Sequence, residues 1–359
     1  MRSTIQYQAA VLERDLGLPA SNDPVEGIVS WCENRVGRFM KLLPCSNLEE
    51  LLGLVANKVG TRFRVVRTDA ELQELVDEYA ARREMGFATL SNDLAPDVFG
   101  ETLRLIQRLP GELPYVSVID ARGAKAYREY FTKWHEIAHL LVLTDQARLT
   151  FFRSHAAIKN PEEQLMDVIA GRVGFYRPLL MPHLPEKLSF ETIQEIQAQM
   201  CPSASRQSAL IGVLSAWPKP ALLLRAEVGV KKAEQSPPGQ AFLWERPSRG
   251  QLRAVSVISN AEARNAGLNI YRNMRVPRSS VIAAATHTSA CLSANEDLSW
   301  WESSSKGPLP SRSVWVQALR NGEAVDALVL DLSTNINDFA PKCDEKTSVP
   351  SIRPPAGSH

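Results

Sequence analysis

The chain has 359 residues, with 41 basic and 40 acidic side chains and a formal net charge of +1. This length exceeds one typical core, so we expect two or three domains, and the balanced charge excludes a general polyanion-binding surface. Five scattered cysteines without a Cys-x-x-Cys pair argue against a disulfide framework and a thiolate zinc site. The N-terminus lacks a signal-peptide core and no run approaches about 18 apolar residues, so we expect a cytoplasmic protein with no membrane span.

Helical patterns dominate the beginning of the chain. Residues 1–45 are predicted to form a helical segment, because their apolar residues recur at loosely helical spacing. Capping-box patterns at Ser46–Glu49 and Thr68–Glu71 each predict the start of a helix. Gly60 predicts the end of the first of these helices, and TRFRVVR after it is typical of a short strand.

The hydrophobic period changes between residues 86 and 125. The runs FATLSND and PYVSVIDARG are typical of strands, and a helix at about 126–143 follows them. We therefore expect a sheet edge just before this helix. An edge strand can bind an extended peptide by strand addition.

The helix at about 126–143 carries an H-E-x-x-H motif. His135 and His139 are four residues apart and share one helix face, so their imidazoles can hold one Zn²⁺ at about 2.0–2.1 Å. Glu136 would then lie beside the metal-bound water and take its proton. The rest of this helix is apolar almost all round, which predicts burial, and a metal explains inward polar groups there. The alternative is two histidines bonded to backbone or carboxylate groups.

A catalytic zinc needs a third protein ligand, and spacing leaves several acids open. Asp145 lies ten residues after His135, but Val142 stands where the chain would have to turn back. Glu163 lies 24 residues after His139, at the start of a second predicted helix, and Glu162 is its neighbour. Acids just after a proline are also common because they favour the helix dipole.

An oxyanion needs a hydrogen-bond donor. His155, in the connector between the two predicted helices, is our candidate for this catalytic role, and Tyr130 and Tyr176 are the alternatives. An exposed loop histidine with no such role is the simpler interpretation of His155. Arg153 and Lys159 nearby could bind substrate or be solvated.

The second half of the chain divides into a helical and a β-rich part. Phe190–Glu227 is predicted to be helical and could form a helix-turn-helix. It carries only Arg206, Lys219 and Arg225 as basic residues, which does not favour direct DNA binding. Residues 241–332 contain the β-like runs AFLWERP, RAVSVIS, SVIAAAT, SVWVQAL and AVDALVLDL, with a hairpin signal at Asn321-Gly322. Residues 333–359 are polar and predicted to be disordered.

Two motifs, in this order and spacing, resemble the ImmA/IrrE-type zinc metallopeptidases. The family patterns are R-F-T-x-x-H-E-x-x-H-x-L and E-x-x-A-[ND]-x-F-A…LLMP, and the matching residues are Phe131, Thr132, His135, Glu136, His139, Leu141, Glu163, Asp167, Ala170 and Leu179–Pro182. Ala138, Met166 and Ile169 depart from the patterns. The resemblance implies that Glu163 is the third metal ligand. It also implies a gluzincin-type peptidase that cleaves helix-turn-helix repressors in stress responses or mobile-element induction, with a sensor-like C-terminal domain.

The predicted fold class is α+β. It comprises an N-terminal helical segment (1–45), a zincin-like metallopeptidase domain (46–189), a helical segment (190–235), a small β-rich C-terminal domain (241–332) and a tail. The first functional hypothesis is a zinc endopeptidase that acts on a protein partner, such as a helix-turn-helix transcriptional repressor. The second is a non-catalytic regulator that binds a repressor or DNA, and the third is a toxin–antitoxin-linked module. Glu136 favours the first, because a structural zinc site has no use for a base.

Overall fold

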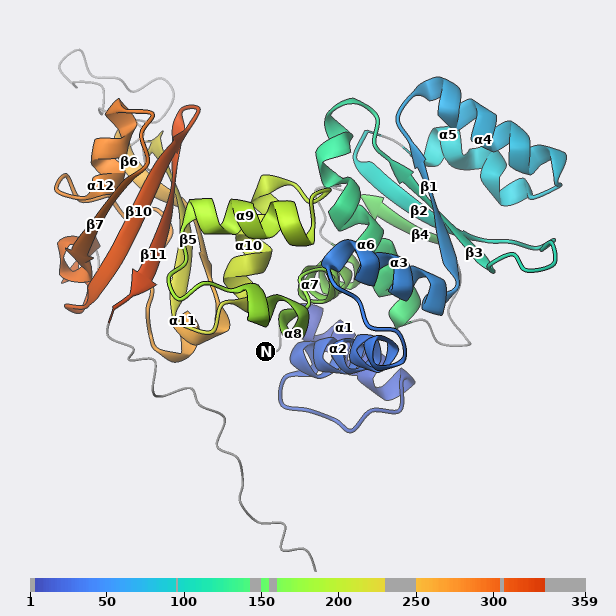
Figure 1. Cartoon of the computed structure of the whole chain (residues 1–359), viewed down its shortest axis with the longest axis horizontal. Coiled ribbons are helices and arrows are strands. Elements are labelled where there is room, and N and C mark those ends of the chain that lie inside the picture. Colours follow the sequence, from blue (N-terminus) through green and yellow to red (C-terminus); the bar gives the residue numbers. More distant parts are fainter. Residues whose placement is uncertain are drawn as a thin grey trace, which may run out of the picture.

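The computed structural model describes residues 4–94, 96–142, 150–154, 160–229, 250–303 and 307–332, with the side chains of 150–154 and 303 excepted. These residues form an α+β protein in which helices connect two β-sheets (Figure 1). The predicted fold class is correct at this level. Within the described ranges, every helix is too short or too polar to cross a membrane.

The chain opens with helices, as predicted. They are α1 (Thr4–Asp15), α2 (Pro24–Leu42) and α3 (Leu48–Val59). Asn47 caps α3, because its side chain accepts from the backbone N–H of Glu50, whose carboxylate in turn accepts from Ser46 N–H. The N-cap of this helix therefore lies one residue later than predicted. Gly60 ends α3 with a φ of 83°, in the left-handed region that glycine adopts readily.

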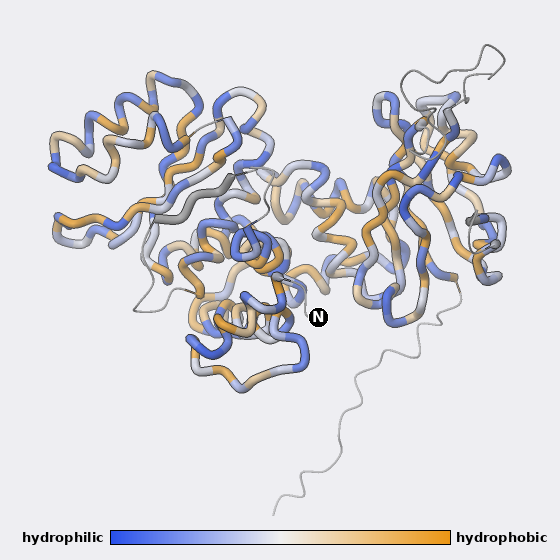
Figure 2. The backbone as a smooth tube through the Cα atoms, turned by 180° about the vertical axis from the view of Figure 1, so that it is seen from behind, coloured by the Kyte–Doolittle hydropathy of each residue, from blue (hydrophilic) through white to orange (hydrophobic). Residues whose placement is uncertain are grey.

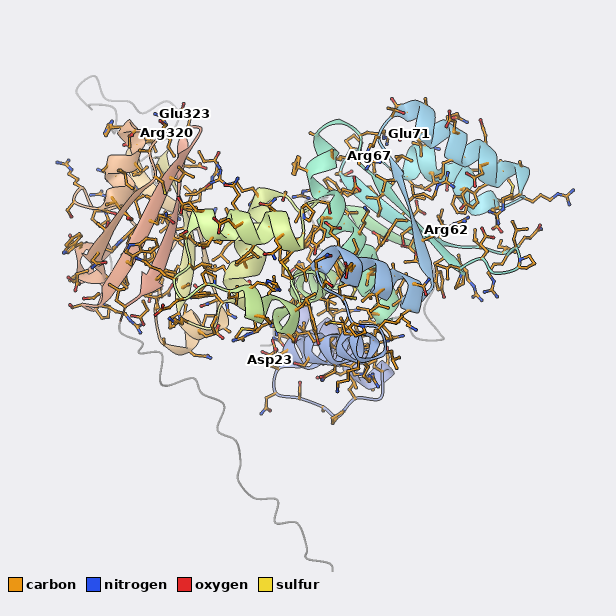
Figure 3. The ribbon with its side chains drawn as sticks, in the orientation of Figure 1. Asp23, Arg62, Arg67, Glu71, Arg320 and Glu323 are labelled. Carbon is orange, nitrogen blue, oxygen red and sulfur yellow. The ribbon has the colours of Figure 1, made fainter. Side chains whose placement is uncertain are left out.

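The first sheet has four strands in the order β1-β3-β2-β4. The strands are β1 (Thr61–Val66), β2 (Val98–Arg104), β3 (Tyr115–Asp120) and β4 (Thr150–Ser154). β1 is parallel to β3, and the other two pairings are antiparallel. The strand and capping predictions for 61–71 are confirmed. Thr68 Oγ1 accepts from Glu71 N–H at 3.1 Å, and Arg67 N–H donates to Glu71 at 2.6 Å, where β1 leads into α4 (Asp69–Ala81) (Figure 3).

The prediction of a strand at FATLSND is wrong. This run lies in the 3-10 helix η1 (Met85–Thr89) and in α5 (Leu90–Asp93), which cover one face of the sheet with α4. Phe87, Leu90 and Leu94 are buried at spacings of three and four residues, so a helical period was hidden in an apparently alternating run. The ring of Phe87 stacks on Tyr79 of α4, with 3.7 Å between centroids.

The expected sheet edge before the metal-motif helix is also wrong. β3 precedes that helix, and it lies between β1 and β2 inside the sheet. The chain crosses over through α4 before it forms β2, so β2 occupies the free side of β3. The edge strand on this side is β4, which follows the helix in the chain.

The motif helix α6 (Glu129–Leu141) follows the 3-10 helix η2 (Gly123–Arg128), and α7 (Pro161–Gly174) packs against it. The chain continues through α8 (Arg177–Leu180), η3 (Met181–His183), α9 (Phe190–Met200) and α10 (Arg206–Ala216). The prediction of helix up to Glu227 is wrong at its end. Prolines at 218 and 220 follow α10, and Ala221–Gly229 is strand β5.

The second sheet has the order β6-β5-β11-β10-β7. Its remaining strands are β6 (Gln251–Ser259), β7 (Leu292–Asp297), β10 (Ser313–Asn321) and β11 (Ala324–Asp331), and β8 (Glu302–Ser303) pairs separately with β9 (Gly307–Pro308). Short helical elements accompany it: α11 (Ala261–Asn265), α12 (Val281–Ala284), η5 (Ala285–His287) and η6 (Leu298–Trp300).

The strand predictions for RAVSVIS, SVWVQAL and AVDALVLDL are confirmed, and so is the hairpin at Asn321-Gly322. The prediction for SVIAAAT is wrong. Ser280 caps α12 there, and Ile282 and Ala285 turn a helical face to the core. The run AFLWERP and the tail 333–359 lie outside the described residues.

One apolar core joins the two sheets. It extends from α1, α2, α3, α6 and α7 through α9 and α10 to Leu223, Trp315 and Leu328 on one face of the second sheet. The opposite face, under α12 and η5, holds a separate core. Figure 2 shows hydrophobic residues along the second sheet and along the helices beside it. The helical middle segment therefore packs against both parts of the protein.

Candidate metal centre

Helix α6 holds the motif in a buried position. His135 and Glu136 are fully buried and His139 is 1% exposed, among apolar neighbours such as Ile137 and Leu141. Arg35 of α2 donates to the carbonyl oxygen of Leu141 at 2.5 Å, which satisfies one of the unpaired carbonyls at the helix end. The protein therefore fixes the motif on a packed helix, and this prediction is confirmed.

Helix α7 packs tightly against α6. The hydroxyl of Tyr130, in the first turn of α6, donates to the carbonyl of Gly174, the last residue of α7, at 2.6 Å. A Cβ on Gly174 would lie 2.9 Å from the ring of Trp134, so only glycine permits this approach. The two helices thus run in opposite directions, which brings the start of α7 beside the histidines of α6.

The start of α7 is specified locally. Asn160 caps the helix by accepting from the N–H of Glu162 at 3.1 Å, and Pro161 occupies the first helical position. Glu163 then lies in the first turn and Asp167 one turn later, on the same helix face.

His135, His139 and Glu163 lie together and could hold a metal ion. Nε2 of His135 is 3.0 Å from Oε2 of Glu163, and Nε2 of His139 is 3.5 Å from Oε1 of the same carboxylate. The two Nε2 atoms are 3.2 Å apart. One candidate ligand atom from each residue falls within 4.8 Å of the other two.

The donor chemistry fits a cation. Nδ1 of His135 is 2.9 Å from Oδ1 of Asp167, and an ionised carboxylate can only accept, so a neutral His135 ring would carry its proton on Nδ1. Nε2 of His135 then presents a lone pair toward the Glu163 carboxylate and toward the second imidazole. Such convergence of electron pairs in a buried place is unfavourable without a cation, and imidazole with carboxylate is a ligand set for transition metals.

The carboxylate of Glu136 is held against the sheet. Its Oε2 accepts a hydrogen bond of 2.8 Å from Oγ1 of Thr102, on β2. Gly100, two residues earlier on the same strand face, leaves room for the other oxygen, because a Cβ there would lie 3.0 Å from Oε1. Neither Thr102 nor Gly100 was predicted from the sequence. Their only sequence signal is a small and a hydroxyl residue at alternate positions of a buried strand.

The structure separates some of the predicted alternatives from the centre. Glu162 is half-buried and stands outside the three-residue group, and burial, followed by the charge of Glu163, raises the pKa of its carboxyl. The hydroxyl of Tyr130 is bonded at the far end of α7, and that of Tyr176 lies 2.7 Å from where a Cβ on Gly37 would be. These two tyrosines are therefore not brought to the motif.

Other predicted residues lie outside the described part of the chain. They are Asp145, His155 and Lys159, together with the side chain of Arg153. The assignment of an oxyanion donor to His155 stays a prediction.

No protein-family model and no curated protein matches this chain. The resemblance to the ImmA/IrrE-type peptidases therefore rests on the two motifs alone.

Proposed function

We propose that this chain is a zinc-dependent endopeptidase with a zincin-like domain, which hydrolyses a peptide bond in a protein partner. The observation that carries the proposal is the convergence of His135 and His139 of α6 with Glu163 of α7. Glu136, the residue after His135, is buried on the same helix α6. A structural zinc site is usually closed by four protein ligands, whereas a catalytic site has three and an adjacent base.

The residues of the site would have different roles in the reaction. His135, His139 and Glu163 would hold the ion, and Asp167 would orient the ring of His135 through its 2.9 Å contact. Zinc in this site would supply Lewis acidity toward the scissile carbonyl and the attacking water. Glu136 would accept the proton of that water on its carboxylate and return it to the leaving amine.

An extended substrate would bind along β4. β4 is an edge strand, with no strand beyond it in the part of the chain described, and it pairs with the β2 strand that carries Thr102. An edge strand presents unpaired backbone groups to which a peptide can bind as a further strand. A flexible segment of a helix-turn-helix repressor is the substrate that the motif resemblance suggests.

The test is cleavage of a defined partner. The zinc-loaded chain is incubated with helix-turn-helix repressors, beginning with any that a neighbouring gene encodes, and products are identified by mass spectrometry. Glu136→Gln is expected to abolish cleavage while it retains zinc, because it removes the base and leaves the ligands. His139→Ala and Glu163→Ala are expected to lose both zinc and activity.

Two outcomes contradict the proposal. Cleavage by Glu136→Gln at the wild-type rate would remove the assigned base. A wild-type chain that binds zinc and the repressor without cleaving it would favour the non-catalytic regulator instead.

A further inference from the structure

A chain of buried hydroxyl groups extends from Glu136 across three strands. Oγ1 of Thr102 on β2 is 2.7 Å from Oγ of Ser117 on β3, and Oγ of Ser117 is 2.8 Å from Oγ1 of Thr61 on β1. All three residues are at most 1% exposed. The three strands are neighbours in the sheet, and these side chains point to the face that α6 covers.

The direction of these hydrogen bonds can be deduced. An ionised carboxylate only accepts, so the single hydroxyl proton of Thr102 is donated to Glu136. Ser117 must therefore donate to Thr102, and Thr61 must donate to Ser117. All three donors point toward the same carboxylate, and successive hydrogen bonds in such a chain strengthen one another.

Gly100 provides the space that this carboxylate occupies beside β2. A Cβ at this position would lie 2.8 Å from Cγ2 of Thr132 and 3.0 Å from Oε1 of Glu136, as well as 3.3 Å from a backbone oxygen of β3. Thr132 is the residue one turn before Glu136 on α6. The side chain of Glu136 can thus approach β2 only because position 100 carries no side chain.

We propose that Thr102, Ser117, Thr61 and Gly100 are positioning residues that fix the carboxylate of the base Glu136 for peptide hydrolysis. This inference rests on the proposed function. Thr102 acts directly on the carboxylate, Ser117 and Thr61 act through Thr102, and Gly100 provides the space. None of the four is in the ligand group.

The alternative is that these hydroxyls only satisfy one another inside a core. Three apolar residues would avoid the cost of burying polar groups, so a purely structural network should affect stability without a special effect on turnover. The chain has a matched structural pair for comparison. Ser280, the N-cap of α12, donates to Glu296 of β7 at 3.0 Å, and both are buried and distant in sequence from the residues of the metal centre.

The experiment measures kcat, KM, zinc content and thermal unfolding for Thr102→Val, Ser117→Ala, Thr61→Val and Gly100→Ala. A lost hydrogen bond to a charged group predicts a fall in kcat of roughly tenfold or more for Thr102→Val, with KM and zinc content unchanged. The loss is expected to diminish from Thr102→Val to Ser117→Ala to Thr61→Val. Thr102→Ser keeps the hydroxyl and is expected to restore kcat, while Ser280→Ala lowers the unfolding midpoint without changing kcat.

A second measurement does not depend on activity. In the full chain without added metal, the unfolding midpoints of Thr102→Val, Glu136→Ala and the double variant are compared. If Thr102 holds Glu136, the two shifts are non-additive, since either change removes the same hydrogen bond.

The outcomes separate the two proposals. The positioning role would be overturned by a wild-type kcat in Thr102→Val, by equal losses of kcat in Thr102→Val, Ser117→Ala and Thr61→Val, or by additive midpoint shifts. The proposed peptidase activity would be unaffected by these outcomes. A wild-type chain that cleaves nothing overturns the proposed function, and the role in catalysis with it.

Discussion

Asp167 lies one helical turn beyond Glu163 on α7, and its Oδ1 is 2.9 Å from Nδ1 of His135. Helix α7 thus supplies the candidate ligand Glu163 and also the carboxylate of Asp167, which contacts the ring of a second candidate ligand, His135. Helix α7 therefore contributes two carboxylates to the candidate centre.

The first prediction concerns this carboxylate. Asp167→Ala is expected to weaken zinc binding by about 10- to 100-fold, because the ring of His135 loses the partner that fixes its tautomer and orientation. Competition with a chromophoric chelator measures the affinity. Asp77→Asn, on the exposed face of α4, is the control and should leave zinc affinity unchanged. An Asp167→Ala chain with wild-type affinity would contradict this role.

The second prediction compares two glycines of α7. Gly174→Ala would place Cβ 2.9 Å from the ring of Trp134, whereas a Cβ on Gly171 would meet no atom of another element or side chain within 4 Å. We expect Gly174→Ala to lower the free energy of unfolding by about 1–3 kcal/mol through overpacking. Gly171→Ala should raise it by about 0.5–1 kcal/mol, because alanine is the better helix former. Urea unfolding measures both, and equal effects would refute the tight approach of α6 and α7.

The third prediction concerns acid stability. Hydrogen bonding from Arg82, assisted by the Leu109 amide and Arg62, holds the pKa of Glu112 at about 2. Its pKa in the unfolded chain is about 4.3. The folded state therefore binds fewer protons, so this stabilisation is complete above the unfolded pKa and is lost as the pH falls toward 2. Unfolding midpoints between pH 7 and 3 should fall less steeply in Glu112→Gln than in the wild type, and parallel curves would contradict the ion pairs.

The fourth prediction concerns Glu101, whose effect on the pH dependence of stability has the opposite sign to that of Glu112. Burial, followed by the charges of Asp93 and Glu136, raises the pKa of Glu101 to about 8. Between about pH 4.3 and 8 the folded chain holds a proton there that the unfolded chain has lost, so stability falls as the pH rises. Glu101→Gln should remove this component and unfold at a higher temperature than the wild type at pH 8.5. A lower midpoint for the variant at that pH would show that the ionised carboxylate is stabilised instead.

Local sequence patterns predicted the parts of the fold that local forces determine. The motif helix, the strand PYVSVIDARG and the Asn321-Gly322 hairpin each carry a strong short-range signal, and each is present. FATLSND and the end of Phe190–Glu227 were misassigned because short apolar runs fit both periods.

The surroundings of Glu136 could not be predicted in the same way. Thr102, Ser117 and Thr61 come from strands that are distant in the chain, and only the order β1-β3-β2 places them in one line. Nothing in the residues near each of them specifies that order.

The apolar core that joins the two sheets has a practical consequence for dissecting this protein. Leu210 and Leu214 of α10 are buried in a core that also includes Leu223 of β5 and Leu328 of β11. A fragment that stops before Ala221 would expose these leucines to water, and a fragment that starts there would lose the helices that shield its sheet. Shortened versions should therefore retain everything from α1 to the end of β11, and separately expressed halves should aggregate.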